Sequence, residues 1–240
     1  NIPFMTAWEA SGHADAASEA FTHWNEEDPQ EIPAECAKCH SGMGFSDYVG
    51  ADGSEMMKVD KAAAIGTVIT CETCHSTAAA SLSSVVFPSG VEVTGLGKEA
   101  VCMTCHQGMA SMVQVDAAVE GQDPDTVNAE LGFTNIHYYA AAATVYAGEV
   151  KGGYQYEGKA YDARNDHVEG YDTCVDCHTS HSLELKVNEC STCHVDVKAV
   201  EDLKDVREPS SGPDYDGDGD VEEGMFYEIE GLQAALYTAM

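Results

Sequence analysis

The feature that most constrains this chain is a five-residue motif, Cys-x-x-Cys-His, which occurs five times. The copies occupy positions 36–40, 71–75, 102–106, 174–178 and 190–194. Their cysteines and histidines are Cys36, Cys39, His40, Cys71, Cys74, His75, Cys102, Cys105, His106, Cys174, Cys177, His178, Cys190, Cys193 and His194. The chain has 10 cysteines, and the five motifs use all of them. Any fold must therefore bring two thiols and an imidazole together five times.

Cys-x-x-Cys-His is the attachment signature of c-type haem. Two thiols add to the two vinyl groups of the porphyrin, and the adjacent histidine becomes an axial ligand of the iron. A Cys-x-x-Cys pair alone could also be a thioredoxin-like redox pair or half of a zinc site. Neither alternative requires a histidine after every second cysteine. The sequence therefore predicts five covalently bound c-type haems.

The histidine count predicts the second ligand of each iron. The chain has 10 histidines, of which five belong to the motifs. Five haems need five distal ligands, and the histidines that remain are His13, His23, His137, His167 and His181. We therefore predict two histidines on every iron. A surface or core position is the simpler interpretation of any one of these five.

Methionine is the alternative distal ligand, and it would raise the reduction potential of the haem. Four methionines lie close to motifs, namely Met43, Met103, Met109 and Met112. Because enough histidines are present, we interpret these methionines as apolar contacts of the porphyrin faces.

An iron with two imidazole ligands has no position for a substrate, so this ligation predicts electron transfer and not catalysis. A nitrite or hydroxylamine reductase is the alternative. Such multihaem enzymes need one open iron, which is frequently marked by a motif with lysine in place of histidine. All five motifs here end in histidine, so we expect no enzyme.

Charge and length limit the fold and the partners. The net charge is −31, from 42 acidic and 11 basic residues. This excludes nucleic acid, whose phosphates need a basic surface, and assembly of copies would require screening by salt or divalent cations. With 240 residues for five haems, the cofactors must supply much of the core. We expect mostly coil with short α-helices and small β-hairpins around a row of five c-type haems, with little regular sheet and no membrane span.

We divide the chain into three parts. Residues 1–35 form a haem-free arm that donates axial histidines, residues 36–205 form the pentahaem core, and residues 206–240 form an acidic tail. Within the core we expect hairpins over 84–94 and 154–161 and a helix over 135–149 with His137 in its first turn. An amphipathic helix is expected from residue 222 onward, with Phe226, Ile229, Leu232 and Leu236 at helical spacing.

The acidic tail resembles the opening of an EF-hand calcium loop, with carboxylates at alternate positions and glycine at the turn. The carboxylates are Asp214, Asp216, Asp218 and Asp220. The twelfth position holds Met225 in place of the bidentate glutamate, although Glu222 or Glu223 could complete the shell. We expect either a calcium ion, with Glu223 among its ligands, or a plain acidic turn.

We also expect an exported protein, because haem of this type is attached on the outer side of the cytoplasmic membrane. The chain starts at Asn1 without methionine, as a chain does after removal of a signal peptide.

The five motifs, the Ser-Gly-His-Ala-Asp around His13 and the Cys-His-x-x-His at 177–181 resemble the multihaem c-type cytochromes. Among these the chain is most similar to the extracellular cytochromes that polymerise into filaments, or nanowires. That resemblance implies a continuous chain of haems, a homo-oligomer with a histidine donated across each subunit junction, and other redox proteins or extracellular acceptors as partners. His13 and His23 are the candidates for that donation. The pentahaem periplasmic electron donors are the other similar group, and they imply a monomeric carrier.

Overall fold

The computed structural model describes residues 2–123 and 125–240, and the chain divides into two compact units. The first unit ends at Val175 and the second begins at Asp176. The division falls inside the fourth motif, between Cys174 and Cys177. Among the described residues, no helix has the length and apolar character needed to cross a bilayer.

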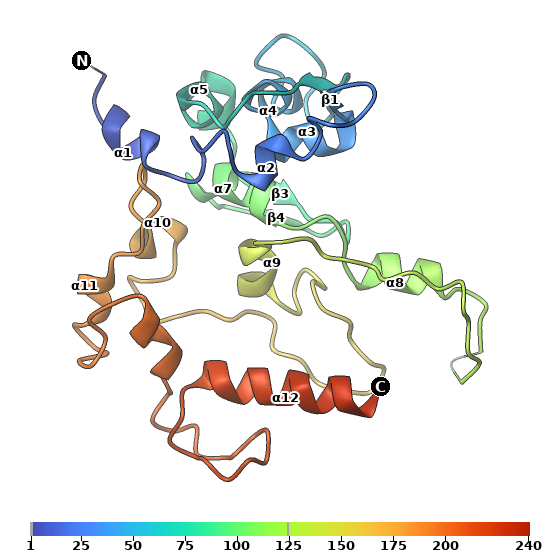
Figure 1. Ribbon diagram of the computed structural model, residues 1–240, viewed down its shortest axis with the longest axis vertical. Coiled ribbons are helices and arrows are strands. Elements are labelled where there is room, and N and C mark those ends of the chain that lie inside the picture. The colour runs from blue at the N-terminus through green and yellow to red at the C-terminus, as the bar shows by residue number, and fades with distance from the viewer. Residues whose placement is uncertain (1, 124) are drawn as a thin grey trace. The chain divides into compact units, whose positions relative to one another are not determined.

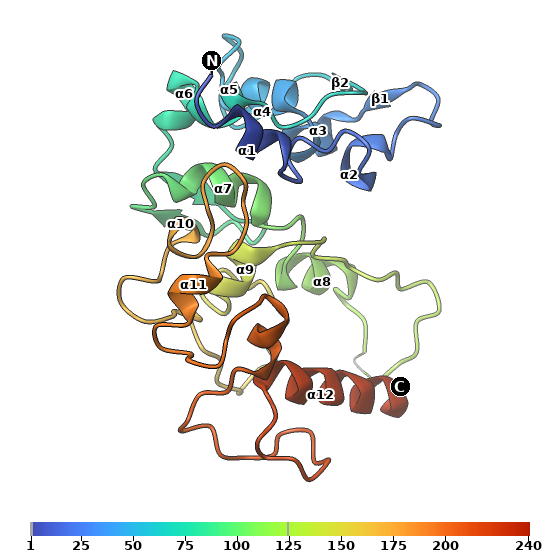
Figure 2. The ribbon, with the colours of Figure 1, turned by 60° about the vertical axis from the view of Figure 1, so that its left-hand side comes forward.

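Short helices and coil make up most of both units (Figures 1 and 2). The helices are α1 (Met5–Glu9), α2 (Glu19–Thr22), α3 (Ala34–His40), α4 (Gly42–Tyr48), α5 (Cys71–His75), α6 (Thr77–Ala80), α7 (Glu99–His106), α8 (Met112–Ala118), α9 (Ala141–Tyr146), α10 (Cys174–Cys177), α11 (Val187–Cys190), the 3-10 helix η1 (Glu201–Asp205) and α12 (Met225–Ala239). The strands are β1 (Glu31–Ile32), β2 (Ala63–Ala64), β3 (Ser84–Val86) and β4 (Glu92–Thr94), paired antiparallel as β1–β2 and β3–β4. This confirms the predicted fold class of coil and short helices with little sheet.

The hairpin expected over 84–94 is confirmed. Val85 pairs with Val93, and both side chains are buried. The turn closes where Gly90 donates its N–H to the carbonyl of Phe87 at 2.8 Å, with Gly90 at φ 84°. Glycine adopts this left-handed conformation without the steric cost that a Cβ adds.

The helix predicted over 135–149 is wrong at both ends, because α9 covers only Ala141–Tyr146. Asn135 does not cap a helix. Its Oδ1 instead accepts the N–H of His137 at 2.9 Å in a local turn, a competition with helix that asparagine commonly provides. His137 and Tyr139 have φ values of 85° and 53°, which a right-handed helix does not allow.

The hairpin predicted over 154–161 is also wrong, since the structure has no strand among these residues. Tyr156 does not pair with an opposite strand. Its N–H is donated to the side-chain hydroxyl of Tyr161 at 2.8 Å, and Lys159 donates its N–H to the carbonyl of Tyr156 at 3.1 Å. The residues form a turn with exposed tyrosines.

The largest apolar cluster surrounds the helix that carries the third motif. It joins the β3–β4 hairpin, α7 and α9 (Figure 1). Its members are Val85, Phe87, Val93, Leu96, Ala100, Met103, Ala142, Ala143, Tyr146 and Val150. Because α7 contributes Ala100 and Met103 to this cluster, burial of apolar surface fixes the position of Cys102–His106.

Helices α3 and α4 pack so closely that only glycine fits at their contact. A Cβ built on Gly44 would lie 2.2 Å from the carbonyl oxygen of Ala37. Ser41 caps α4 by accepting N–H groups from Met43 and Gly44 at 3.2 and 3.4 Å. The same contact holds the end of α3, which carries the first motif.

Replacing Gly44 by alanine should therefore force these helices apart. We expect Gly44→Ala to cost about 1–3 kcal/mol of unfolding free energy, the usual range for overpacking, and to lower Tm by roughly 5 °C. The control is Gly132→Ala, since a Cβ on Gly132 meets nothing within 4 Å. Thermal unfolding followed by circular dichroism would contradict this packing if the two variants melted together.

A buried ion pair organises the second unit. Arg207 donates to Glu228 at 2.6 Å, and the two side chains are 10% and 1% exposed. Arg207 also donates to the backbone carbonyls of Ser211, Pro213 and Glu223. One guanidinium thus connects the acidic segment 208–223 to α12.

The helix predicted from residue 222 onward is confirmed as α12, although its buried face is not the predicted one. Phe226, Ile229, Leu232 and Leu236 are 42–61% exposed, and Glu228 is the buried side chain. The reason is the Arg207 ion pair, which turns Glu228 inward.

The ionised form of Glu228 is stabilised by the groups that donate hydrogen bonds to its carboxylate. Burial raises the pKa of Glu228, but hydrogen bonds from Arg207 and from the N–H groups of Tyr215 and Asp216 outweigh it, so the pKa lies below its usual value. A carboxylate with a lowered pKa contributes stability above the pKa of the unfolded chain. That contribution is lost as pH falls through the folded value.

Removing the guanidinium of Arg207 should lower the local stability of residues 208–228. We expect Arg207→Gln to accelerate hydrogen exchange in residues 208–228 at neutral pH, because Glu228 keeps its charge and loses its partner. As pH falls from about 4, near the ordinary glutamate pKa, through the lower folded value of Glu228, the wild type should approach the variant. The control is Lys58→Gln, which breaks the exposed Lys58–Asp60 pair. Equal exchange in wild type and Arg207→Gln at neutral pH would contradict this role.

Candidate functional site

Helical turns hold the motif cysteines. The first and third motifs end α3 and α7, the second is α5, the fourth lies on α10, and the fifth begins at the end of α11. Residues three apart lie on one face of a helix. The Cys-x-x-Cys spacing therefore directs both sulfurs of each helical motif to the same side, as attachment to one porphyrin edge requires.

The motif cysteines form no disulfides. All ten are unpaired, and none falls in the fully buried class of residues. Thioether formation needs unpaired thiols, because a sulfur held in a disulfide could not react with a vinyl group. The cysteines therefore fit covalent haem attachment.

Thiols of different motifs lie next to one another in the first unit. Cys39 Sγ approaches the carbonyl of Cys105 at 3.9 Å, and Cys105 Sγ approaches the carbonyl of Lys38 at 3.6 Å. A hydrogen bond with Cys105 lowers the pKa of Cys39 to about 7, and the same bond together with burial raises the pKa of Cys105. The first and third motifs are therefore neighbours.

A second pair of thiols connects the third motif with Cys174. The hydrogen bond between Cys102 and Cys174 lowers the pKa of Cys102 and raises the pKa of Cys174. Glu99 Oε1 also accepts the backbone N–H of Cys174 at 2.6 Å. The helix α7 thus contacts cysteines of two other motifs.

Three motif histidines are oriented by backbone carbonyls. The Nδ1 atoms of His40, His106 and His178 lie 2.7, 3.0 and 2.8 Å from the carbonyls of Ala20, Tyr139 and Leu183. A carbonyl only accepts, so Nδ1 carries the proton and Nε2 keeps its lone pair. Histidines that bind metals commonly have this second hydrogen bond. These imidazoles fit the axial position of a haem iron.

Two motif histidines face a second histidine. The ring centroids of His13 and His106 are 6.3 Å apart with 24° between the ring planes. Those of His40 and His137 are 5.9 Å apart with 79° between the planes. Burial and then His106 lower the pKa of His13, while burial is the main cause that lowers the pKa of His40. The neutral imidazole, the form that binds metal, is therefore favoured at both.

The other predicted distal ligands lie elsewhere. His23 ends α2 with an exposed side chain, and its Nδ1 is 2.9 Å from a carboxylate oxygen of Glu19. The His23 ring also contacts Trp24. His167 is exposed in the coil after α9, and His181 is half-buried after α10. Iron ligation by these three residues stays a prediction, as it does for every other histidine of the chain.

The methionines near the motifs have different surroundings. Met103 is 4% exposed and belongs to the apolar cluster around α7, whereas Met43 and Met109 are 59% and 50% exposed. Met103 therefore packs inside the protein, and contact of these methionines with porphyrin faces stays a prediction.

Several groups at the site could not be found from the sequence. The carbonyls of Ala20, Tyr139 and Leu183 are backbone atoms, and no side chain marks them. Gly108 is different, because a glycine two residues after the third motif can be recognised in the sequence as a site of close backbone approach. Its φ is 85°, and a Cβ there would lie 2.8 Å from the carbonyl oxygen of Ile136. Gly108 thereby allows the segment that contains His137 to approach the third motif.

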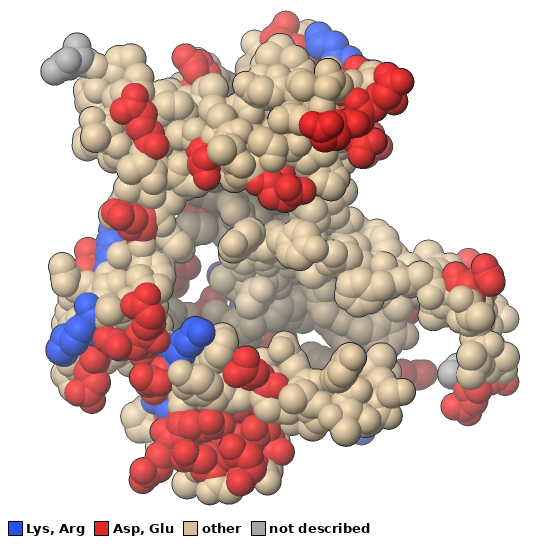
Figure 3. Space-filling model, viewed as in Figure 1, with Lys and Arg blue, Asp and Glu red and all other residues tan. Residues whose placement is uncertain are grey.

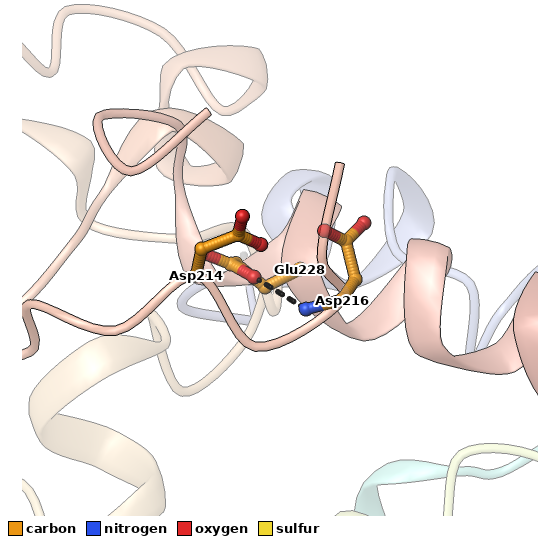
Figure 4. A group of neighbouring side chains, drawn as sticks. All are labelled: Asp214, Asp216 and Glu228. Atoms are coloured by element: carbon orange, nitrogen blue, oxygen red, sulfur yellow. Dashed lines mark hydrogen bonds between the residues drawn. The ribbon is translucent and has the colours of Figure 1, made fainter. Parts of the chain in front are cut away.

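The acidic tail gathers carboxylates, as Figure 3 shows for the side chains beside α12. Asp214, Asp216 and Glu228 each place an oxygen within 4.8 Å of the others, and their carboxylates converge in Figure 4. Asp216, Asp218 and Glu223 form a second such group. The sequence missed Glu228 because it lies three residues beyond the twelfth loop position. Asp220 is outside both groups and accepts the N–H of Glu222.

Comparison with known families gave one match. Residues 19–107 match the family model described as cytochrome c7 and related cytochrome c. The matched segment contains the first three motifs and His23, and it covers well under half of the chain. Neither the curated proteins nor the solved structures gave a match.

The match and the site geometry agree on the class of protein. The match supports a multihaem c-type cytochrome with covalently bound haem, and it implies multihaem electron transfer. The free thiols and the oriented motif histidines fit this class independently of the match.

Proposed function

We propose that the chain transfers electrons through five covalently bound c-type haems, each with two histidine ligands, as a subunit of an exported, extracellular filament that carries respiratory electrons outward. The observation that carries this proposal is the pairing of motif histidines with second histidines about 6 Å away, at His106 and at His40. We extend the same ligation to the remaining three motifs.

The thiols, the motif histidines and three backbone carbonyls have different roles toward the haem. Haem supplies one-electron redox chemistry when it is bound. The thiols would attach it and the motif histidines would bind it through Nε2. The carbonyls of Ala20, Tyr139 and Leu183 fix the imidazole orientation at three of the five motifs. A histidine on each side leaves no position for a substrate, so these residues support electron transfer and not bond chemistry.

The thiol contacts support short electron-transfer steps. Cys39 with Cys105 and Cys102 with Cys174 bring porphyrin attachment points of different motifs into direct contact. The net charge of −31 also favours the more positive ferric state, which lowers reduction potentials. Low potentials and close spacing suit a conductor of respiratory electrons.

The filament and the alternative differ in the use of the N-terminal histidines. His23 is exposed, with 58% of its side chain accessible, and this supports donation to another molecule. His13 was the other candidate for that donation, but it lies against His106 of its own chain. The alternative, a monomeric periplasmic pentahaem carrier that donates to a reductase, is supported by this pairing within one chain.

Calcium in the tail remains part of the proposal. Asp214, Asp216, Asp218 and Glu223 would be its ligands, because they provide neighbouring oxygens. The alternative, an acidic turn without calcium, is supported by Glu228. Its carboxylate oxygens already accept hydrogen bonds from Arg207 and from the N–H groups of Tyr215 and Asp216.

The number of haems tests the cofactor assignment. We expect the pyridine haemochrome assay to give five haems per chain, and the double variant Cys102→Ala/Cys105→Ala to give four, because each thioether bond needs a thiol and this variant leaves the third motif with none. Fewer than five in the wild type would contradict the assignment.

Electron microscopy tests the filament. We expect the wild type to form fibres in salt that screens the net charge, and His23→Ala to give particles, because the exposed imidazole is lost. The control is Glu19→Gln, which removes the negative charge beside His23 Nδ1 and keeps the imidazole, so fibres should persist. A homogeneous wild-type monomer with five six-coordinate irons would establish the carrier instead.

A further inference from the structure

Two histidine pairs are spaced as the two axial ligands of one iron would be. A metal–imidazole bond is about 2 Å and a ring centroid lies roughly 1 Å behind its nitrogen, so two imidazoles on one iron have centroids about 6 Å apart. The observed separations are 6.3 Å for His13 with His106 and 5.9 Å for His40 with His137. Both pairs combine one motif histidine with one histidine far from it in sequence.

Two histidines, His137 and His23, lie near His40, and either one could be the distal ligand at the first motif. The His23 ring contacts Trp24 at 4.9 Å, and Trp24 contacts His40 at 5.2 Å. His23 is thus connected to His40 through an indole and also pairs with Glu19. His137 contacts the His40 ring directly, and we therefore choose His137.

The backbone around His137 supports a defined placement. His137 and Tyr139 both have positive φ, a conformation that is unfavourable for residues with a Cβ and that persists only where surrounding contacts impose it. Two contacts do so here. Met109 donates its N–H to the carbonyl of Ile136 at 2.9 Å, and His106 Nδ1 donates to the carbonyl of Tyr139 at 3.0 Å.

These contacts make one short segment serve two motifs. His137 faces His40 of the first motif, while the carbonyl of Tyr139, two residues later, orients His106 of the third motif. The adjacent thiols of Cys39 and Cys105 bring the same two motifs together on their helices. Segment 136–140 therefore contacts the histidines of both the first and the third motifs.

We propose that His137 is the distal ligand at the first motif and His13 the distal ligand at the third, both within one chain. This rests on the proposed function, since it assigns ligands to two of the five haems. His23, His167 and His181 then remain for the second, fourth and fifth motifs. Donation across a subunit junction would therefore use one of these three histidines.

The ring planes give the two sites different spectra. Nearly perpendicular imidazoles, as in His40 with His137 at 79°, give ferric low-spin haem a highly anisotropic electron paramagnetic resonance signal. Nearly parallel imidazoles, as in His13 with His106 at 24°, give a rhombic signal. Loss of His137 should therefore remove an anisotropic signal, and loss of His13 a rhombic one.

Methionine substitution in the holoprotein tests the assignment. We expect His137→Met and His13→Met each to move one fifth of the redox titration to higher potential, because methionine ligation raises the potential. The diagnostic comparison uses a background without the first haem, Cys36→Ala/Cys39→Ala. There the shift from His137→Met should vanish and the shift from His13→Met should remain. His23→Met is the matched control, and its shift should also remain.

The outcomes separate this assignment from the proposed function. A shift from His137→Met that survives without the first haem, or one from His23→Met that vanishes there, would overturn the assignment while five low-spin haems in the wild type still upheld the function. Fewer than five low-spin haems in the wild type would instead overturn the function. If His137→Met attaches fewer haems, His137→Ala with added imidazole should restore the anisotropic signal, and failure to restore it would contradict the ligand role.

Discussion

Imidazole held in one tautomer and one direction is the constraint on which the rest of this structure depends. A histidine can bind iron only when one ring nitrogen is free of its proton and points at the metal. The backbone carbonyls of Ala20, Tyr139 and Leu183 fix this state for three motif histidines. Two of these carbonyls, of Tyr139 and Leu183, lie in segments between helices, and the third lies in α2. Segments without regular structure therefore help to orient the motif histidines.

Small packing contacts are enough to position the motif helices. The main apolar cluster surrounds α7, and Gly44 lets α3 and α4 touch. Both arrangements fix a motif helix without a large sheet or a long bundle. In the second unit a polar contact has the corresponding role, where Arg207 connects an acidic segment to α12 through the buried Glu228. The strong negative charge is thus compatible with local order, since one guanidinium neutralises the carboxylate that is removed from water.

The sequence was sufficient for most patterns with a local chemical meaning, although the turn pattern at 154–161 did not produce the predicted hairpin. It identified the motif positions, the 84–94 hairpin and the helix at the C-terminal end, because cysteine spacing, turn glycines and helical periodicity act over a few residues. It failed around His137, where Asn135 forms a local turn and tertiary contacts impose positive φ on His137 and Tyr139. It also missed Glu228, whose burial depends on Arg207, 21 residues away. The pairing of His137 with His40 could not be predicted, because no local signal connects residues that meet only after folding.

The proposed function requires two histidine ligands on every haem iron. The most direct test is near-infrared magnetic circular dichroism of the fully oxidised wild-type protein, quantified against its haem content. Bis-histidine, histidine–methionine and high-spin ferric haems give separate bands in this region. We expect the bis-histidine band alone, with an intensity equal to five haems per chain. A high-spin band, or a methionine band from any of the five, would contradict it.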